Sequence, residues 1–386
     1  MWAGVAFWVL GLAVLFAAWD AGRRILNEDA PPQPPQENTA LILPCRGVDP
    51  EFPAFLQALA GQSLPKYKLF FVVSAPDDEA VPLIRDFQAK HAGLAELVAF
   101  PPPPGYAGKI ANMLGGVEAA TAGDYAYLVF LDSDTVPDPE FAAHLIAPLA
   151  RGEAMLTTGA RILVPQQGTL AQWVASLWLL SSLPGVARPQ WGSAWGGAMA
   201  MRASDATRLD VTRIWKDAFS DDHTLSRAVR ADGGRIAFVS HCLVPIPIHY
   251  RWPDMVDFLV RQLVTIRVHD FRLWLLTWMM AYPLALLLVG LGQMQGGQFL
   301  GAGLTFSALL PLTFAYHLLN EAVWKRLRLP AVHFRQRPLW QQAGAFAALI
   351  FVHPFVMVRS ALLRSFIWRG RRYVVRGGRI LCETLR

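Results

Sequence analysis

The chain has 386 residues, of which 54% are hydrophobic and only 17% are charged, and its net charge is +6. Soluble domains carry about 25% charged residues, so this composition excludes an ordinary soluble protein and indicates membrane segments beside a folded domain. The three cysteines, Cys45, Cys242 and Cys382, have no zinc-ligand spacing and give no disulfide framework.

The first apolar run extends from Trp2 to Trp19 and is followed by Arg23 and Arg24. It is about long enough to span a bilayer and has no evident cleavage site, so we expect a transmembrane anchor over residues 1–19. Basic flanks stay on the cytoplasmic side, which predicts an integral protein of the cell (inner) membrane with a cytoplasmic catalytic domain. Residues 20–38, rich in Pro and Gln, predict a linker.

Residues 39–255 alternate apolar strands with helices, which is typical of an α/β domain with a parallel sheet. The expected strands are Ala40–Leu43, Leu69–Val73, Ala95–Phe100 and Tyr125–Leu131, and the expected helices are Asp49–Ala60, Val81–His91 and Gly108–Ala122. In such sheets ligands bind beyond the carboxyl ends of the strands. Asp78 and Asp132 each follow such an end, so we expect the binding site there.

Residues 256–270 are expected to lie at the membrane interface and residues 271–363 to form membrane helices. The apolar runs Leu273–Leu291 and Phe299–Leu319 are each long enough to cross a bilayer. The run Ala343–Val358 is shorter than the ~20 residues that a span needs.

Many arginines follow this third run. Three crossings would place them outside, against the positive-inside rule, so we expect the third run to be re-entrant or interfacial. Residues 364–386 then form a basic cytoplasmic tail, with a β-hairpin that turns at Gly377-Gly378.

Asp132 and Asp134 stand on a turn directly after an apolar strand. Two carboxylates in this position typically hold a Mg²⁺ or Mn²⁺ ion that also binds a diphosphate. Such an ion neutralises charge on a departing nucleoside diphosphate. An ordinary turn or helix cap has the same spacing, and the motif alone leaves both interpretations open.

Two further acidic positions support a site. Asp78 follows the second strand, where its carboxylate can accept hydrogen bonds from a base edge or a ribose hydroxyl, or cap the next helix. Asp221 and Asp222 precede a helix that begins near Thr224. A carboxylate there can act as general base, although a helix start favours its ionised form and burial is needed to raise its basicity.

Two glycine-containing segments complete the candidate site. Gly108 and Lys109 open a helix and can face phosphate, or Lys109 can be a surface side chain. Gly196 and Gly197 interrupt a strand-like run, where glycine permits a ligand to approach the backbone or marks a β-bulge.

In this order the segments resemble the ceramide glucosyltransferase-like branch of inverting glycosyltransferases (family 21, related to family 2), which includes bacterial ceramide and hopanoid glycosyltransferases. The resemblance runs from about residue 39 to the C-terminus. Residues 44–50 resemble the branch's opening P-x-x-G-V-D-P segment, and residues 368–373 resemble its W-R-G-x-x-Y tail. It implies a GT-A-type nucleotide-sugar-binding domain (α/β, a Rossmann-like mixed sheet) with an N-terminal transmembrane helix and a C-terminal membrane region.

The resemblance also implies roles for single residues. Asp222 is expected to be the catalytic base, and Asp132 with Asp134 to hold Mg²⁺ or Mn²⁺. The expected donor-binding residues are Pro44, Arg46, Gly47, Asp78, Lys109, Asp132, Gly196, Gly197, Arg261 and Arg267.

One motif departs from the family pattern. The family's Arg-Trp pair ahead of the membrane helices is replaced by Val264 and Thr265, although Arg261 fits the motif's first position. The missing pair normally helps to hold the diphosphate and the acceptor. Arg267, one helical turn after Leu263, is the expected substitute.

The implied reaction moves glucose or N-acetylglucosamine from a UDP-sugar to a hydroxyl of a ceramide-, hopanoid- or diacylglycerol-type membrane lipid. The expected partners are the donor, the lipid acceptor and the bilayer, and no nucleic acid, because no basic run is interleaved with stacking aromatics. Two alternatives remain: a processive polysaccharide synthase, and a non-catalytic membrane binding protein derived from a transferase.

Overall fold

The structure, a computed structural model, describes residues 2–27, 32–33, 35–188, 192–216 and 218–383. The chain divides into two compact units. The sheet unit comprises Glu28–Arg161, Arg188–Ile246 and Arg364–Arg386, and the helical unit comprises Met1–Asn27, Ile162–Ala187 and Pro247–Leu363.

A seven-stranded sheet has the strand order β3-β2-β1-β4-β6-β5-β7. β1 pairs in parallel with β2 and β4, and β2 pairs in parallel with β3, as the alternating strands and helices predicted. β6 runs antiparallel to β4 and β5, so the sheet is mixed. The strands are β1 Thr39–Cys45, β2 Tyr67–Val73, β3 Ala95–Ala99, β4 Tyr127–Leu131, β5 Leu156–Pro165, β6 Ala198–Arg202 and β7 Ile236–Ile248.

Helices cover both faces of this sheet. Every residue of β1 and β4 is buried, which explains why both read as continuous apolar runs rather than alternating ones. The helices of the sheet unit are α2 Phe52–Ala60, α3 Val81–Lys90, α4 Gly108–Thr121, α5 Phe141–Ala150, α8 Ala203–Leu209, α9 Val211–Lys216 and α10 Asp221–Ala231.

Helix α4 packs unusually close to the sheet because its inner face has glycines. A Cβ atom added to Gly116 would lie 2.4 Å from the Ile42 Cγ2 atom of β1, and one added to Gly115 would lie 2.5 Å from the ring of Phe100. No larger side chain fits between this helix and β1 without a shift. The small residues of α4 therefore fix where its first turn, with Lys109, meets the strand ends.

The last residues of the sheet unit form a second, three-stranded antiparallel sheet, which we call the tail sheet. Its strands are β8 Ser365–Trp368, β9 Arg371–Arg376 and β10 Arg379–Glu383. The predicted turn at Gly377-Gly378 joins β9 to β10, and both glycines have positive φ. The strand β8, which the sequence did not predict, pairs with the other edge of β9.

Among the residues that the structure describes, four helices, all in the helical unit, are long and apolar enough to cross a membrane: Trp2–Ile25, Phe271–Gln295, Phe299–Leu327 and Leu339–Leu362. These correspond to α1 Trp2–Ile25; α12 Phe271–Thr277, η1 Trp278–Ala281 and α13 Tyr282–Gln295; α14 Phe299–Ser307 and α15 Leu309–Leu327; and α16 Leu339–Leu362. The remaining helices are α6 Leu170–Leu180, α7 Leu183–Val186, α11 Trp252–His269, η2 Pro330–Val332 and η3 Phe334–Gln336.

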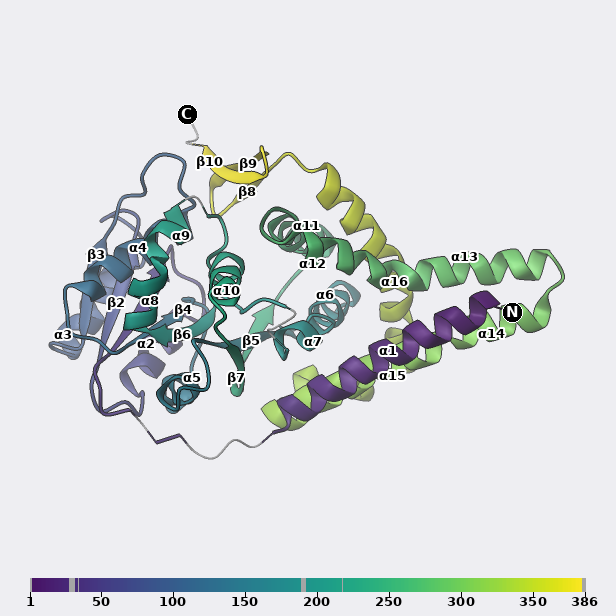
Figure 1. The fold of residues 1–386 in the computed structure, drawn as a ribbon, viewed down its shortest axis with the longest axis horizontal. Helices are drawn as coiled ribbons and strands as arrows, with labels where there is room; N and C mark the ends of the chain where they lie inside the picture. Colours follow the sequence, from purple (N-terminus) through teal and green to yellow (C-terminus); the bar gives the residue numbers. More distant parts are fainter. Residues whose placement is uncertain (1, 28–31, 34, 189–191, 217, 384–386) are drawn as a thin grey trace. The chain divides into compact units, whose positions relative to one another are not determined.

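These helices pack in two groups within the helical unit. α1 lies along α14 and α15 (Figure 1), and the indole of Trp8 donates to the hydroxyl of Ser307 at 2.9 Å. α16 packs mainly against α11 and α6, where the indole of Trp178 donates to His353 Nδ1 at 3.0 Å. α16 has 24 residues, so the expectation that the third apolar element is too short to span is wrong.

Replacing Gly159 of β5 tests how closely β5 and β7 pack. A Cβ atom there would lie 2.1 Å from the backbone oxygen of Cys242, and backbone cannot move aside as a flexible side chain can. We expect Gly159→Ala to lower the free energy of unfolding by about 1–3 kcal/mol and Tm by several degrees. Gly61→Ala, which makes only ordinary contacts at 3.8 Å, is the control in the same thermal unfolding measurement in detergent. An unchanged Tm for Gly159→Ala would contradict this packing.

Candidate active site

The carboxyl ends of β1, β2 and β4 meet at one edge of the sheet, because these strands are parallel neighbours. Pro44 is a buried residue of β1 itself, while Arg46 and Gly47 follow its end. Asp78 lies in the loop after β2, and its Oδ1 atom accepts the backbone N–H of Gly47 at 2.9 Å and that of Ala80 at 3.0 Å. Asp78 therefore joins the two loops and orders the start of α3.

Asn112 of α4 ties the same two strand ends to the helix. Its amide donates to the carbonyl of Cys45 at 3.0 Å, and its side-chain oxygen accepts from the Ser74 hydroxyl at 3.0 Å. The side chain is buried, so these bonds are shielded from water.

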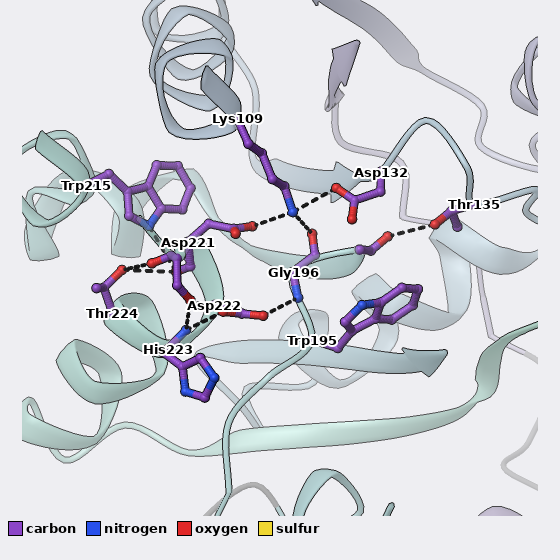
Figure 2. A network of polar contacts seen from close by, with 12 residues as sticks. Lys109, Asp132, Thr135, Trp195, Gly196, Trp215, Asp221, Asp222, His223 and Thr224 are labelled. Atoms are coloured by element: carbon purple, nitrogen blue, oxygen red, sulfur yellow. Dashed lines mark hydrogen bonds and ion pairs between the residues drawn. The ribbon is translucent and has the colours of Figure 1, made fainter. Parts of the chain in front are cut away.

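Lys109 is the centre of a polar network (Figure 2). Its Nζ atom lies 2.7 Å from Asp132 Oδ1 and 3.1 Å from Asp221 Oδ2, and it donates to the carbonyl of Gly196 at 3.2 Å. Burial by itself would lower the pKa of Lys109, but the two carboxylates raise it above its ordinary value. Lys109 is thus a largely buried cation, with 19% of its side chain exposed, that links the loop after β4 to the start of α10.

Asp132 and Asp134 lie on the turn after β4, where Asp132 N donates to the carbonyl of Gly197 at 3.2 Å. The Oδ1 atom of Asp134 is buried and has no hydrogen-bond partner in the structure. Burial, together with the Asp132 carboxylate, raises the pKa of Asp134 to about 6. A buried carboxylate oxygen without a donor fits a divalent cation, which needs oxygen ligands and no hydrogen bond.

Among the described residues there is no cluster of three or more Asp, Glu, His or Cys side chains in metal-binding geometry. Two carboxylates are what a Mg²⁺- or Mn²⁺-type site needs when phosphate oxygens and water complete the shell. Asp132 and Asp134 would hold such an ion, and the chemistry it would supply is stabilisation of negative charge on phosphate.

Asp221 and Asp222 begin α10 but have different surroundings. Asp221 is buried next to Lys109, whereas Asp222 is only half-buried. The Asp222 carboxylate accepts the N–H of Gly196 at 3.0 Å and the N–H of His223 at 2.7 Å (Figure 2). It also accepts the hydroxyl of Ser220.

These surroundings move the two pKa values apart. Burial raises the pKa of Asp221, against the opposing charge of Lys109. Burial would also raise the pKa of Asp222, but His223, the Ser220 hydroxyl, Lys109 and the hydrogen bond from the adjacent glycine amide together hold it below its ordinary value. Asp222 is therefore ionised at neutral pH and within reach of solvent.

Gly196 and Gly197 lie just before β6 rather than inside a strand. A Cβ atom on Gly196 would be 2.4 Å from Asp221 Oδ2, and one on Gly197 would be 2.1 Å from the ring of Trp195. The groups that approach these glycines closely are therefore side chains of the protein itself. The glycines let the backbone of this loop bind Asp222 and Lys109 directly.

The tail sheet contributes residues that the sequence analysis did not assign to the site. The guanidinium of Arg369 donates to both carboxylate oxygens of Asp49 at 3.1 and 2.8 Å. The charges of Asp49, Asp134 and Asp132 all raise the pKa of Arg369. In the sequence, the resemblance of residues 368–373 to the family's W-R-G-x-x-Y segment marks Arg369, but it does not identify Asp49 as its partner.

Arg261 and Arg267 lie on α11, which belongs to the helical unit. The guanidinium of Arg267 donates to the carbonyl of Ala361 and, at 3.1 Å, to that of Leu363, so it caps the end of α16. The guanidinium of Arg261 lies 5.7 Å from the ring centre of Phe258.

The fold is similar to that of solved GT-A glycosyltransferases. The mannosyltransferase PcManGT from Pyrobaculum calidifontis, in complex with GDP-Man and Mn²⁺, has a TM-score of 0.50 at 16% identity, over 93% of this chain and 95% of that chain. GalNAc-T7 with UDP, GalNAc and Mn²⁺ has a TM-score of 0.41 at 11% identity, over 65% of this chain and 52% of that chain.

Among curated proteins, none matches the sequence. The profile of glycosyl transferase family 21 matches residues 5–381, which is nearly the whole chain. This match and the fold support a glycosyltransferase that takes its sugar from a nucleotide-sugar donor. The chain belongs to glycosyl transferase family 21.

Proposed function

We propose that this membrane protein is an inverting glycosyltransferase that moves glucose or N-acetylglucosamine from a UDP-sugar to a hydroxyl of a ceramide-, hopanoid- or diacylglycerol-type lipid. The observation that carries the proposal is the pair of unlike acidic sites around Lys109. The first site is Asp132 with Asp134, which offer oxygen ligands, and Asp132 contacts the ammonium group of Lys109. The second is the ionised, half-buried Asp222, which accepts the N–H of Gly196.

The proposed reaction is a single displacement. Asp222 accepts the proton of the lipid hydroxyl while the hydroxyl oxygen attacks the anomeric carbon, and the bond from that carbon to the diphosphate oxygen breaks. UDP leaves with the electron pair of that bond, and attack from the opposite face inverts the anomeric configuration. Asp132 and Asp134 would hold a Mg²⁺ or Mn²⁺ ion, and the chemistry it would supply is stabilisation of negative charge on the diphosphate.

Lys109 and Asp78 hold the donor in this proposal. Lys109 balances the carboxylates around it, which lets a negatively charged donor enter an acidic site. Asp78 keeps the loop after β1 in place through Gly47 and leaves its second oxygen for the nucleoside. Pro44, Arg46 and Gly197, which lie in the same unit, remain proposed donor-site residues.

The apolar helices support a lipid acceptor and a location in the cell (inner) membrane. Arg23 and Arg24 at the end of α1 favour a cytoplasmic catalytic domain. The tail sheet packs on the catalytic fold within one unit, since Arg369 bonds to Asp49 at 2.8 Å. The chain must then cross the membrane an even number of times between residues 247 and 363, which supports two crossings with α16 interfacial or re-entrant.

Replacing Asp222 tests the base. We expect Asp222→Asn to lower kcat by roughly 10²–10⁴-fold because an amide cannot take the proton, with little change in KM for the donor. The assay is UDP release from UDP-glucose and UDP-N-acetylglucosamine with ceramide and diacylglycerol acceptors. Asp86→Asn, an exposed aspartate of α3, is the control. Unchanged turnover in Asp222→Asn would overturn the base assignment.

A second variant tests the same carboxylate through its pKa. Ser220→Ala removes a hydroxyl that bonds the ionised form, which raises the pKa of Asp222. The fall of kcat on acidification should therefore begin at a higher pH than in the wild type, and Ser220→Thr, which keeps a hydroxyl, should behave as the wild type. An acidic limb that does not move in Ser220→Ala would argue against Asp222.

Replacing Asp134 tests the cation site without turnover. We expect Asp134→Asn to weaken Mn²⁺ binding in the presence of UDP by at least ~10-fold, because a charged oxygen ligand is lost. The measurement is a titration by electron paramagnetic resonance of free Mn²⁺. Asp124→Asn, at the other end of β4, is exposed and should bind as the wild type does. Equal Mn²⁺ affinity in both variants would remove Asp134 from the site.

Cysteine labelling tests the proposed topology. We expect Arg376→Cys in the tail sheet and Glu118→Cys in α4, both exposed, to react with a membrane-impermeant maleimide only in inside-out vesicles. Gln298→Cys, in the exposed connection between α13 and α14, should react only in intact spheroplasts. Labelling of Arg376→Cys and Glu118→Cys from opposite sides would contradict an even number of crossings.

A further inference from the structure

The tail sheet packs directly on the loop that carries the two aspartates of α10. Phe219, two residues before Asp221, has its ring centre 5.7 Å from that of Phe366, 5.9 Å from that of Trp368 and 5.1 Å from that of Tyr373. Edge-to-face contacts of this kind are favourable and directional. The first hairpin of the tail sheet is therefore held against the candidate active site by aromatic packing.

The turn of this hairpin has a backbone conformation that costs free energy. Trp368 pairs with Arg371, so the turn consists of Arg369 and Gly370, with φ values of 49° and 68°. Two left-handed residues fit a tight hairpin turn, but a non-glycine residue adopts this conformation at a cost. An arginine kept in such a position suggests a functional constraint, and here it places Arg369 on Asp49.

The same hairpin places Arg371 beside another arginine. A Cβ atom on Gly108, the first residue of α4, would lie 2.9 Å from Arg371 Nη1, and one on Gly370 would lie 3.8 Å from Arg46 Nη2. Burial, and then the charge of Arg371, lower the pKa of Arg46. Two guanidinium groups thus lie close together beside the first turn of α4.

The cations near the acidic site differ in whether a carboxylate neutralises them. Lys109 is paired with Asp132 and Asp221, and Arg369 is paired with Asp49. Within the part of the chain that the structure describes, neither Arg46 nor Arg371 has a carboxylate within 4.0 Å. Like charges repel, so this pair is unfavourable unless an anion lies between the two side chains.

We propose that Arg46 and Arg371 bind the phosphates of the nucleotide-sugar donor, which makes the tail sheet part of the donor site. The proposal rests on the proposed function, because it takes the donor to be a nucleoside diphosphate sugar. Guanidinium groups bind phosphate oxygens through paired, charge-assisted hydrogen bonds. Arg371 is a binding residue in this scheme, and Arg369 is a positioning residue that holds the turn through Asp49.

The location of Arg371 explains how the site works without the Arg-Trp pair. Val264 and Thr265 stand at those positions, and neither side chain carries a charge. The charge that the diphosphate needs comes instead from β9, at the other end of the sequence. Donor binding therefore requires the folded tail sheet.

The test compares Arg371→Gln with Arg372→Gln in the full-length protein in a maltoside detergent, which contains no phosphate. Arg372 is the next residue of β9, is exposed, and faces Glu383 at 3.7 Å. Isothermal titration calorimetry would measure binding of UDP, GDP and uridine. We expect Arg371→Gln to raise Kd for the nucleoside diphosphate by roughly 10-fold or more, and Arg372→Gln to leave it unchanged.

Further readouts separate binding from folding. Kd for uridine should not change in Arg371→Gln, since the nucleoside has no phosphate, and Arg371→Lys should recover part of the affinity because it keeps the charge. Equal affinity of Arg371→Gln and Arg372→Gln for UDP, or an equal loss for UDP and uridine, would overturn the inference and leave the proposed function intact. If the wild-type protein binds GDP and not UDP, the proposed UDP-sugar donor is wrong, and the same comparison of Arg371→Gln with Arg372→Gln is made with GDP. If the wild-type protein binds neither nucleotide, both the proposed donor and the proposed phosphate site are wrong.

Discussion

The contact of one largely buried ammonium group with two carboxylates is the interaction on which the site depends. Lys109 Nζ reaches Asp132 after β4 and Asp221 at the start of α10, and thereby joins two segments far apart in sequence. Removing one partner of a buried ion pair costs about 3–5 kcal/mol because the other charge stays buried without compensation. The network therefore specifies the arrangement of these loops.

The neighbouring carboxylates of Asp221 and Asp222 illustrate how surroundings assign roles. They stand side by side in sequence, but one is sealed against Lys109 and the other reaches solvent while it accepts two backbone N–H groups. Amide and hydroxyl donors stabilise the ionised form, whereas burial disfavours it. In the proposed reaction Asp221 is a structural carboxylate and Asp222 a reactive one, and acid–base sites typically separate the pKa values of two carboxylates in this way.

The tail sheet extends the catalytic fold with residues from the opposite end of the chain. Its aromatic side chains pack around Phe219, and Arg369 bonds to Asp49 from a left-handed turn. This packing couples the segment after the last apolar helix to the segment after the first one. In the proposed topology both ends of the helical unit lie on the same side of the membrane, which links the topology to the assembly of the site.

The sequence by itself determined the alternation of strands and helices, the apolar segments and the acidic positions at strand ends, because each depends on local composition and on the periodicity of a single element. It also indicated family membership through Pro44 to Pro50 and Trp368 to Tyr373. It missed β8 and the close contacts of Gly196 and Gly197 with Asp221 and Trp195.

Only the tertiary structure decided which charges neutralise one another. It paired Lys109 with Asp132 and Asp221, used Arg267 to cap α16, and left Arg46 beside Arg371. Ion pairing depends on distances of a few ångströms between side chains that lie tens to hundreds of residues apart, and these distances are set by how helices and loops pack on the sheet. No local pattern in the sequence encodes that packing.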